Sequence, residues 1–139
     1  MQFVIANPAT GVIIQITSAS DPSEVAWAVA DGLIVIDAGD TDVAVLLTQY
    51  VRLSDQTLQP QQALPAFNKT TVTANGIDAV TIASGLPNPT HVTVSGPGAD
   101  SFDVTDGALT LHFSLAGMYQ VRLVAGPAWA ISTVNITGT

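Results

Sequence analysis

The clearest pattern in the sequence is that of Leu109-Thr110-Leu111-His112-Phe113-Ser114-Leu115-Ala116-Gly117-Met118-Tyr119-Gln120-Val121-Arg122-Leu123-Val124. Every second side chain is apolar in residues 109–114, and the alternation returns in residues 119–124. Because successive side chains of a strand point to opposite faces, each run predicts a strand with one buried and one exposed face. A turn at Ala116-Gly117 separates the runs. Tyr119 opens the second strand, where the tyrosine corner of a β-sandwich is expected.

The same kind of run recurs through the C-terminal part, with Gly, Pro and Asn-Gly or Asp-Gly turn signals between the runs. Seven strands are predicted: Thr70–Thr73, Ala79–Ala83, His91–Ser95, Ser101–Val104, Leu109–Ser114, Met118–Val124 and Trp129–Thr137. Seven short strands in about 70 residues are typical of an immunoglobulin-like sandwich, here without the disulfide of antibody domains. We therefore predict a mainly β protein with an immunoglobulin-like β-sandwich at residues 68–139.

Residues 60–67, Pro-Gln-Gln-Ala-Leu-Pro-Ala-Phe, contain two prolines and show no periodicity, so they predict an extended linker. Residues 1–59 before it predict a small α+β module. Its first element is a hairpin, in which apolar runs at Gln2–Ala6 and Val12–Thr17 flank the turn residues Asn7 to Gly11.

A helix is expected after this hairpin. Asp21 can cap it, Pro22 suits its first position and Glu24 suits its first turn. Val25, Ala28 and Val29 fall on one helical face, and Gly32 can end the helix. A strand is expected next, at Leu33–Ile36. It is followed either by a helical turn capped by Thr41-Asp42 or by a strand at Val43–Leu47. A hairpin of Gln49–Leu53 with Thr57–Gln59 completes the module.

Composition excludes several function classes. The chain has 139 residues, of which 47% are hydrophobic and 10% charged, and its three Lys and Arg face eleven Asp and Glu for a net charge of −8. So few basic residues cannot neutralise a nucleic-acid backbone or hold an anionic membrane surface. There is no Cys, which excludes disulfides and thiolate metal sites. We expect no nucleic-acid or membrane partner.

The start of the chain and its hydropathy bear on location. Residues 1–5 lack the basic segment and cleavage site of a signal peptide. The longest apolar stretch, Val25 to Ile36, is interrupted by Asp31-Gly32 and is shorter than the ~20 residues that span a bilayer. The chain is therefore expected to be made in a cytoplasm without an export signal.

Candidate chemistry is sparse. The cluster Asp37-Ala38-Gly39-Asp40-Thr41-Asp42 fits either a calcium loop or a solvated turn with a helix cap, and its spacing is not that of an EF-hand. The acidic stretch 100–106 fits either a calcium site or the outer face of a strand followed by a hairpin turn at Asp106-Gly107. His91 and His112 lie outside any nucleophile-elbow or metal-ligand pattern and are expected to be exposed histidines. We predict no catalytic residues, no cofactor and no resident metal.

Three aromatic residues are candidate interface residues: Trp27, Tyr50 and Trp129. Trp27 is expected to pack between helix and sheet, and Trp129 to lie in the core at the start of the last strand. The alternative is an anchor at a subunit contact, where Trp is enriched, and Tyr50 fits either role.

Several turn-plus-strand segments resemble a known group of proteins. They are the hairpin at Phe3-Val4, the acidic turn 37–42 before Gln49-Tyr50-Val51, residues 63–69, 74–79, 84–87 and 104–107, and Ala116-Gly117-Met118-Tyr119-Gln120-Val121-Arg122. Together they are similar to the small tail and tail-fibre structural proteins of tailed bacteriophages and prophages. The chain departs from that group in Leu115-Ala116-Gly117, where Leu-Pro-Gly is usual, and in a short segment after residue 124 with few aromatics.

The resemblance implies a structural role in a virion, in a tail fibre or at the periphery of the baseplate. Alternatives are a capsid decoration or cement protein and a carbohydrate-binding, adhesin-type module. The implied partners are other virion proteins and a host surface glycan or receptor. Closed cyclic symmetry is usual for oligomers, and a homotrimer is the expectation for a phage appendage.

The charge divides unevenly along the chain. Residues 1–67 hold seven acids and one base, for a net −6, and residues 68–139 hold four acids and two bases, for a net −2. From this difference we expect the less charged C-terminal part to carry more of the packing or display surface.

Overall fold

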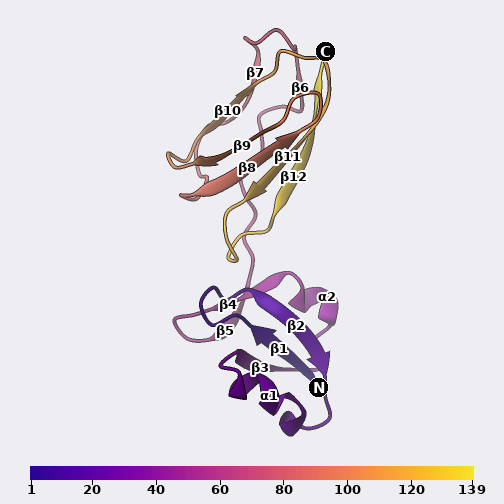
Figure 1. Ribbon diagram of the computed structural model, residues 1–139, viewed down its shortest axis with the longest axis vertical. Coiled ribbons are helices and arrows are strands. Elements are labelled where there is room, and N and C mark those ends of the chain that lie inside the picture. Colours follow the sequence, from indigo (N-terminus) through magenta and orange to yellow (C-terminus); the bar gives the residue numbers. More distant parts are fainter. The chain divides into compact units, whose positions relative to one another are not determined.

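The computed structural model describes all 139 residues and divides the chain into two compact units, Met1–Gln62 and Ala63–Thr139 (Figure 1). The fold is mainly β, with several sheets and little helix, which confirms the predicted class. The boundary falls within residues 60–67. Both ends of that segment belong to the units, because Pro60 pairs with Gln49 while Leu64 and Phe67 pack against the C-terminal core.

The N-terminal unit contains a three-stranded antiparallel sheet of order β2-β1-β3 and a separate hairpin of β4 and β5. Its elements in chain order are β1 (Gln2–Ala6), β2 (Ile13–Ser18), the 3₁₀ helix η1 (Pro22–Val25), α1 (Ala26–Ala30), β3 (Ile34–Gly39), α2 (Val43–Leu46), β4 (Gln49–Arg52) and β5 (Thr57–Pro60). Both predicted hairpins are confirmed.

The helical segments begin where their caps predict. The Asp21 carboxylate accepts from the backbone N–H of Ser23, and Glu24 accepts from the backbone N–H of Asp21, so the two form a capping box. Asp42 caps α2 through the N–H of Ala44, which decides for the helical alternative at residues 43–47. The helical face was predicted incorrectly at Val29, whose side chain is 62% exposed.

The core of the N-terminal unit forms two small clusters. One contains Val4, Ala6, Ile34, Leu46 and Val51, and the other Phe3, Ala19 and Val25. Gly11 joins the β1–β2 turn to β4, because its carbonyl accepts from the Val51 N–H at 2.9 Å. At this glycine φ is +77°, and a Cβ would lie 2.0 Å from the Val51 carbonyl oxygen. No other residue fits there without moving the backbone.

The C-terminal unit contains all seven predicted strands. They are β6 (Thr71–Val72), β7 (Ala79–Ile82), β8 (Thr90–Ser95), β9 (Asp100–Val104), β10 (Leu109–His112), β11 (Gly117–Val124) and β12 (Ser132–Gly138). The last strand begins at Ser132, so the prediction that it starts at Trp129 is wrong. Gly126-Pro127 favours a turn instead, with Trp129 N–H donating to the Gly126 carbonyl.

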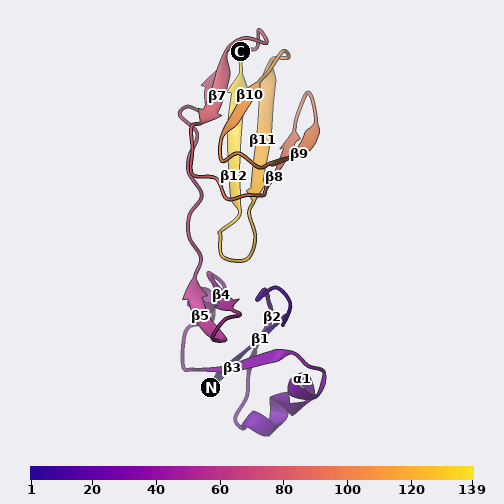
Figure 2. The same cartoon turned by 90° about the vertical axis from the view of Figure 1, so that its left-hand side faces the viewer.

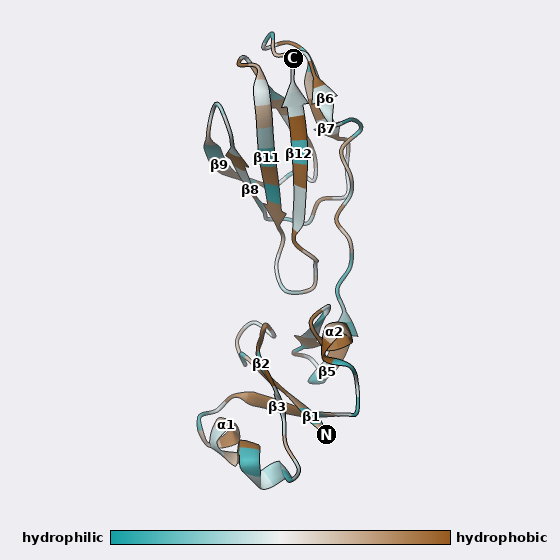
Figure 3. Cartoon of the chain, turned by 90° about the vertical axis from the view of Figure 1, so that its right-hand side faces the viewer, coloured by the Kyte–Doolittle hydropathy of each residue, from teal (hydrophilic) through white to brown (hydrophobic).

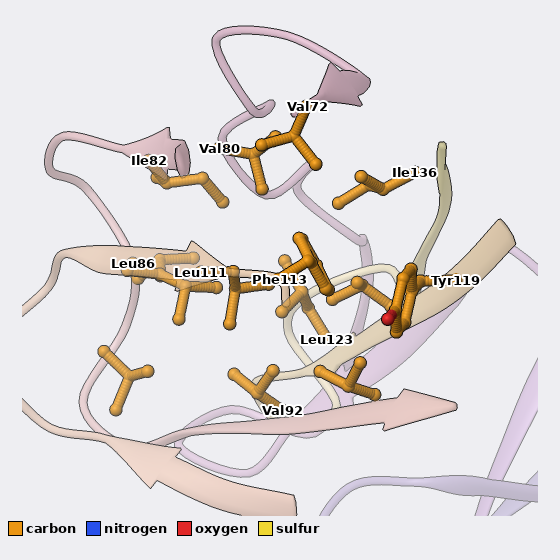
Figure 4. Packing of buried hydrophobic residues seen from close by; sticks show 14 residues of the cluster. Val72, Val80, Ile82, Leu86, Val92, Leu111, Phe113, Tyr119, Leu123 and Ile136 are labelled. Carbon is orange, nitrogen blue, oxygen red and sulfur yellow. The ribbon is translucent and has the colours of Figure 1, made fainter. Parts of the chain in front are cut away.

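These strands form a five-stranded sheet, β6-β12-β11-β8-β9, and a two-stranded sheet, β10-β7 (Figures 1 and 2). All pairs are antiparallel except β6 with β12, the first and last strands of the unit. Fourteen buried residues from both sheets meet in one cluster (Figure 4). The alternation read from the sequence is present, since Leu109, Leu111 and Phe113 are buried while Thr110, His112 and Ser114 are exposed.

Tyr119 lies in that cluster, at the start of β11. Its phenol donates to the Leu115 carbonyl at 2.7 Å, and its ring centroid lies 4.3 Å from that of Phe113. The hydroxyl of a buried tyrosine needs such a partner. The backbone hydrogen bond expected of Tyr119 is therefore present.

Candidate functional site

The structure does not assemble the three candidate interface residues into one site. They lie on different elements: Trp27 in α1, Tyr50 in β4 and Trp129 in the turn before β12. The expectation that Trp27 packs between helix and sheet is wrong, because its side chain is 48% exposed. Trp129 is half-buried and lies outside the C-terminal core, which contradicts its predicted core position. Tyr50 is half-buried.

The N-terminal unit exposes many large apolar side chains. Its members are Met1, Val12, Ile14, Trp27, Val29, Val43, Val45, Leu47 and Leu53, and we call these nine the exposed apolar set. The C-terminal unit exposes four. Leu47 is 69% exposed and follows α2 directly. Figure 3 shows the apolar colour on α2.

The two short helices contribute four of the nine, and Leu47, directly after α2, is a fifth. The sequence of α1 is Ala-Trp-Ala-Val-Ala and that of α2 is Val-Ala-Val-Leu, with no polar residue in either. A helix packed on a sheet buries one face. An all-apolar helix must then expose apolar side chains on the other, as α1 does with Ala28 buried and Trp27 and Val29 exposed. This composition was the signal in the sequence that the periodicity argument missed.

Carboxylates of the N-terminal unit serve its turns and caps. In the acidic turn, Asp37 accepts from the Gly39 N–H at 2.8 Å, and Asp42 caps α2. Asp40 lies 3.6 Å from the N-terminal amine of Met1. The hydrogen bonds from the Ser20 hydroxyl and N–H lower the pKa of Glu24. No group of three or more His, Asp or Glu is placed to hold a metal ion.

His91 forms a hydrogen-bonded chain across β8 and β9. Its Nδ1 lies 2.7 Å from Asp103 Oδ1, and its Nε2 lies 3.0 Å from the Ser101 hydroxyl oxygen. The histidine is about half exposed, as predicted. The sequence did not reveal the two partners, because the pairing depends on the register that places His91 opposite Asp103. The chain of hydrogen bonds ties the edge strand β9 to β8 on the solvent side.

A cavity of about 200 Å³ opens in the C-terminal unit. Its apolar lining comes from both sheets and includes Val94, Phe102, Leu111 and Phe113. Asp100, in β9, also lines it. The His91 chain is not part of this lining. The cavity can therefore receive one large apolar side chain with a polar or charged group beside it.

Comparisons with protein-family models, with curated proteins and with solved structures find no match to this chain. No helix in it is long and apolar enough to cross a membrane.

Proposed function

We propose that this chain is a structural protein of a tailed-phage virion, in a tail fibre or at the periphery of the baseplate. The observation that carries the proposal is the exposed apolar set of the N-terminal unit, nine large side chains in 62 residues. Exposed apolar side chains that lie together mark protein–protein contacts, and Val43, Val45 and Leu47 lie together in and directly after α2. The resemblance of the turn-plus-strand segments to small phage tail proteins supplies the kind of assembly.

The N-terminal unit packs against other virion proteins in this proposal. Trp27 and Leu47 are its strongest anchor candidates, because both are large, apolar and about half exposed or more. The unit has a net charge of −6, so a basic rim on the neighbouring protein would complement it. This reverses the expectation from charge alone, which assigned packing to the C-terminal part.

The C-terminal unit is an immunoglobulin-like sandwich that is displayed toward the host surface. Support comes from the strand order, with β7 and β10 facing the sheet β6-β12-β11-β8-β9 across one core. The hydrogen bond from Tyr119 to the Leu115 carbonyl matches the tyrosine corner of that fold. The outer faces of β8 and β11 are exposed and mostly polar, as display requires.

Immunogold labelling of phage particles with antibody against this chain tests the location. Label at the tail tip or along a fibre is the expected result. Label on the capsid would favour the decoration protein, and particles without label would overturn the virion proposal.

Incorporation of variants tests which unit packs. The double substitution Val45→Ser and Leu47→Ser is expected to reduce the amount of the chain in purified particles at least ~10-fold, since losing two apolar anchors costs a few kcal/mol of association. The double substitution Leu115→Ser and Ile131→Ser is the matched control, because these side chains of the C-terminal unit are also about half exposed. Equal incorporation of both variants would contradict packing through the N-terminal unit.

A further inference from the structure

The two edges of the sheet β10-β7 differ in whether their backbone groups have hydrogen-bond partners. On the β7 side, the Thr81 carbonyl accepts from the Asn68 N–H at 2.9 Å, and the Asn68 side-chain oxygen accepts from the Thr81 N–H at 2.8 Å. Asn68 thereby satisfies both backbone groups of Thr81 that face away from β10. The segment before β6 covers this edge.

The edge on the β10 side is open. The carbonyls of Gly107 and Phe113, which flank β10, accept from Leu86 and Gly76, on the side where β7 pairs. Because backbone groups alternate between the two sides of a strand, those of Leu109 and Leu111 face β7. The N–H and C=O of Thr110 and His112 then face away from it, and no strand pairs with β10 there. Unpaired edge groups of this kind are a template for another strand.

The 200 Å³ cavity lies beside this open edge. Residues of β10 and the segment after it line one wall, residues of β8 and β9 with their connecting loop line the other, and β7 takes no part. Figure 2 shows β10 on the side of its sheet toward β9. A strand added to β10 would therefore point alternate side chains into the cavity, where Phe102 and Leu111 are apolar.

Charge indicates what kind of strand fits. Asp100 lines the cavity, and Asp103 and Asp106 follow it in the same segment, which contains no Lys or Arg. Two of the chain's three basic residues are already used, Arg52 with Asp55 and Lys69 with Asp78. The third, Arg122, has its side chain on the exposed face of β11, opposite to the face that carries the buried Val121 and Leu123. No ion pair of the chain includes Asp100, so a basic side chain beside it would come from another protein.

We propose that the open edge of β10 binds an extended segment of another protein as an added strand. The segment places one large apolar side chain in the cavity and a Lys or Arg beside Asp100. Backbone hydrogen bonds to Thr110 and His112 hold it in register. The site belongs to the C-terminal unit alone, so it stands whether or not the chain is a virion protein.

Binding of a peptide library to the full-length chain tests the proposal. The probes are fluorescein-labelled decapeptides built on threonine. One position is varied among apolar residues, and the positions two residues before and after it are varied among Lys, Thr and Glu, because side chains two residues apart lie on the same face of a strand. We expect fluorescence anisotropy to select Phe, Leu or Ile at the apolar position with Lys two residues away, and a Kd between about 1 μM and 1 mM. No binding by any member up to about 5 mM, or equal binding of Lys and Glu peptides, would overturn the proposal.

Backbone methylation separates strand addition from simple side-chain binding. Two versions of the best peptide are compared, one N-methylated at its odd-numbered residues and one at its even-numbered residues. One version is expected to lose binding and the other to keep it, because only every second amide faces β10. Amide NMR signals of Thr110 and His112 should shift with the bound peptide. Equal effects of the two phases, or shifts confined to other strands, would contradict an added strand.

Two carboxylates provide the matched pair for the charge. Asp100→Asn is expected to weaken binding of the Lys peptide about two- to fivefold, the range for an exposed ion pair. Asp106→Asn removes the same charge outside the cavity lining and should leave the Kd unchanged. Both variants keep the side-chain oxygen that accepts a local backbone N–H. If Asp100→Asn and Asp106→Asn changed the Kd equally, Asp100 would not contact the Lys of the peptide.

Discussion

The two units are similar in size but differ in how many apolar side chains they bury and expose. The C-terminal unit buries fourteen residues in one cluster between two sheets and exposes four large apolar side chains. The N-terminal unit buries five and three in two clusters and exposes nine. Strands that face each other across one core bury one face of each. Short all-apolar helices on a three-stranded sheet cannot do the same.

This difference indicates that the N-terminal unit depends more on its surroundings. A unit of about 60 residues buries only ~60% of the surface that its unfolded chain exposes, so its stability is marginal. The surface that it leaves exposed is available to a partner. We expect the C-terminal unit to be the more stable of the two, and the tryptophans report each unit separately, Trp27 in the first and Trp129 in the second.

The largest expected effect is that of Gly11→Ala. The added Cβ would lie 2.0 Å from the Val51 carbonyl oxygen, so β4 must leave the β1–β2 turn. We expect the N-terminal unit to unfold at 25 °C, seen as a loss of the Trp27 fluorescence transition in a Trp129→Phe background. Gly32→Ala is the matched control, because φ is also positive there but no atom lies within 4 Å. A folded N-terminal unit in Gly11→Ala would contradict this role.

Leu123→Ala follows, in the other unit. Leu123 is fully buried in the C-terminal cluster, and truncation of a buried leucine costs about 2–5 kcal/mol. Urea denaturation followed by Trp129 in a Trp27→Phe background should show this loss, while the transition of Trp27, followed in a Trp129→Phe background, stays in place. Met118→Ala, at an exposed position of the same strand, should shift neither. An equal shift of both transitions would mean that the units unfold together.

Asp21→Ala tests the capping box that starts the helical segment of the N-terminal unit. Loss of an N-cap side chain costs about 1 kcal/mol. We expect that decrease in the free energy of unfolding reported by Trp27, with Asp21→Asn close to the wild type because an amide oxygen also accepts from the Ser23 N–H. If alanine and asparagine destabilise the unit equally, the cap is not what holds this helix start.

The smallest effect is a pH dependence. A hydrogen bond from Lys69, followed by one from the Thr73 N–H, lowers the pKa of Asp78 below its ordinary value of 3.8. The carboxylate therefore stabilises the C-terminal unit above pH 3.8, and this contribution disappears as the pH falls through the lowered pKa. Between pH 5 and pH 2, the urea midpoint reported by Trp129 should therefore depend less on pH in Asp78→Asn than in the wild type.

Asp55 provides the same test in the N-terminal unit. Hydrogen bonds from Arg52 and then Thr57 lower its pKa. In Asp55→Asn, the urea midpoint reported by Trp27 is expected to depend less on pH, while the midpoint reported by Trp129 keeps its pH dependence. If each substitution changed both responses, the two units would not titrate separately.

Local signals predicted much of this fold. The alternation around Leu111 and Tyr119 and the turn residues between runs located all seven C-terminal strands. Asp21 and Asp42 are caps, and caps act within a few residues of themselves, so the sequence reveals them. The mainly β class followed from these elements.

Features that depend on tertiary contacts were not predictable in this way. Neither the parallel pairing of β6 with β12 nor the partners of His91 is encoded in a local pattern. The exposure of Trp27 depends on which face of α1 meets the sheet, and an all-apolar helix does not specify that face. The open edge of β10 depends on the absence of a neighbouring strand, which no single run of residues displays.

The parallel pairing of β6 and β12 has a mechanical consequence. Thr137 and Thr139 donate to the carbonyls of Thr70 and Val72, and Ala74 donates back to Thr139. When tension is applied to the chain before β6 and at the end of β12, two parallel strands are pulled in opposite directions along their length. The hydrogen bonds between them are then stretched together in shear instead of opening one after another like a zipper. The C-terminal unit would resist extension along this axis until the whole group yields at once.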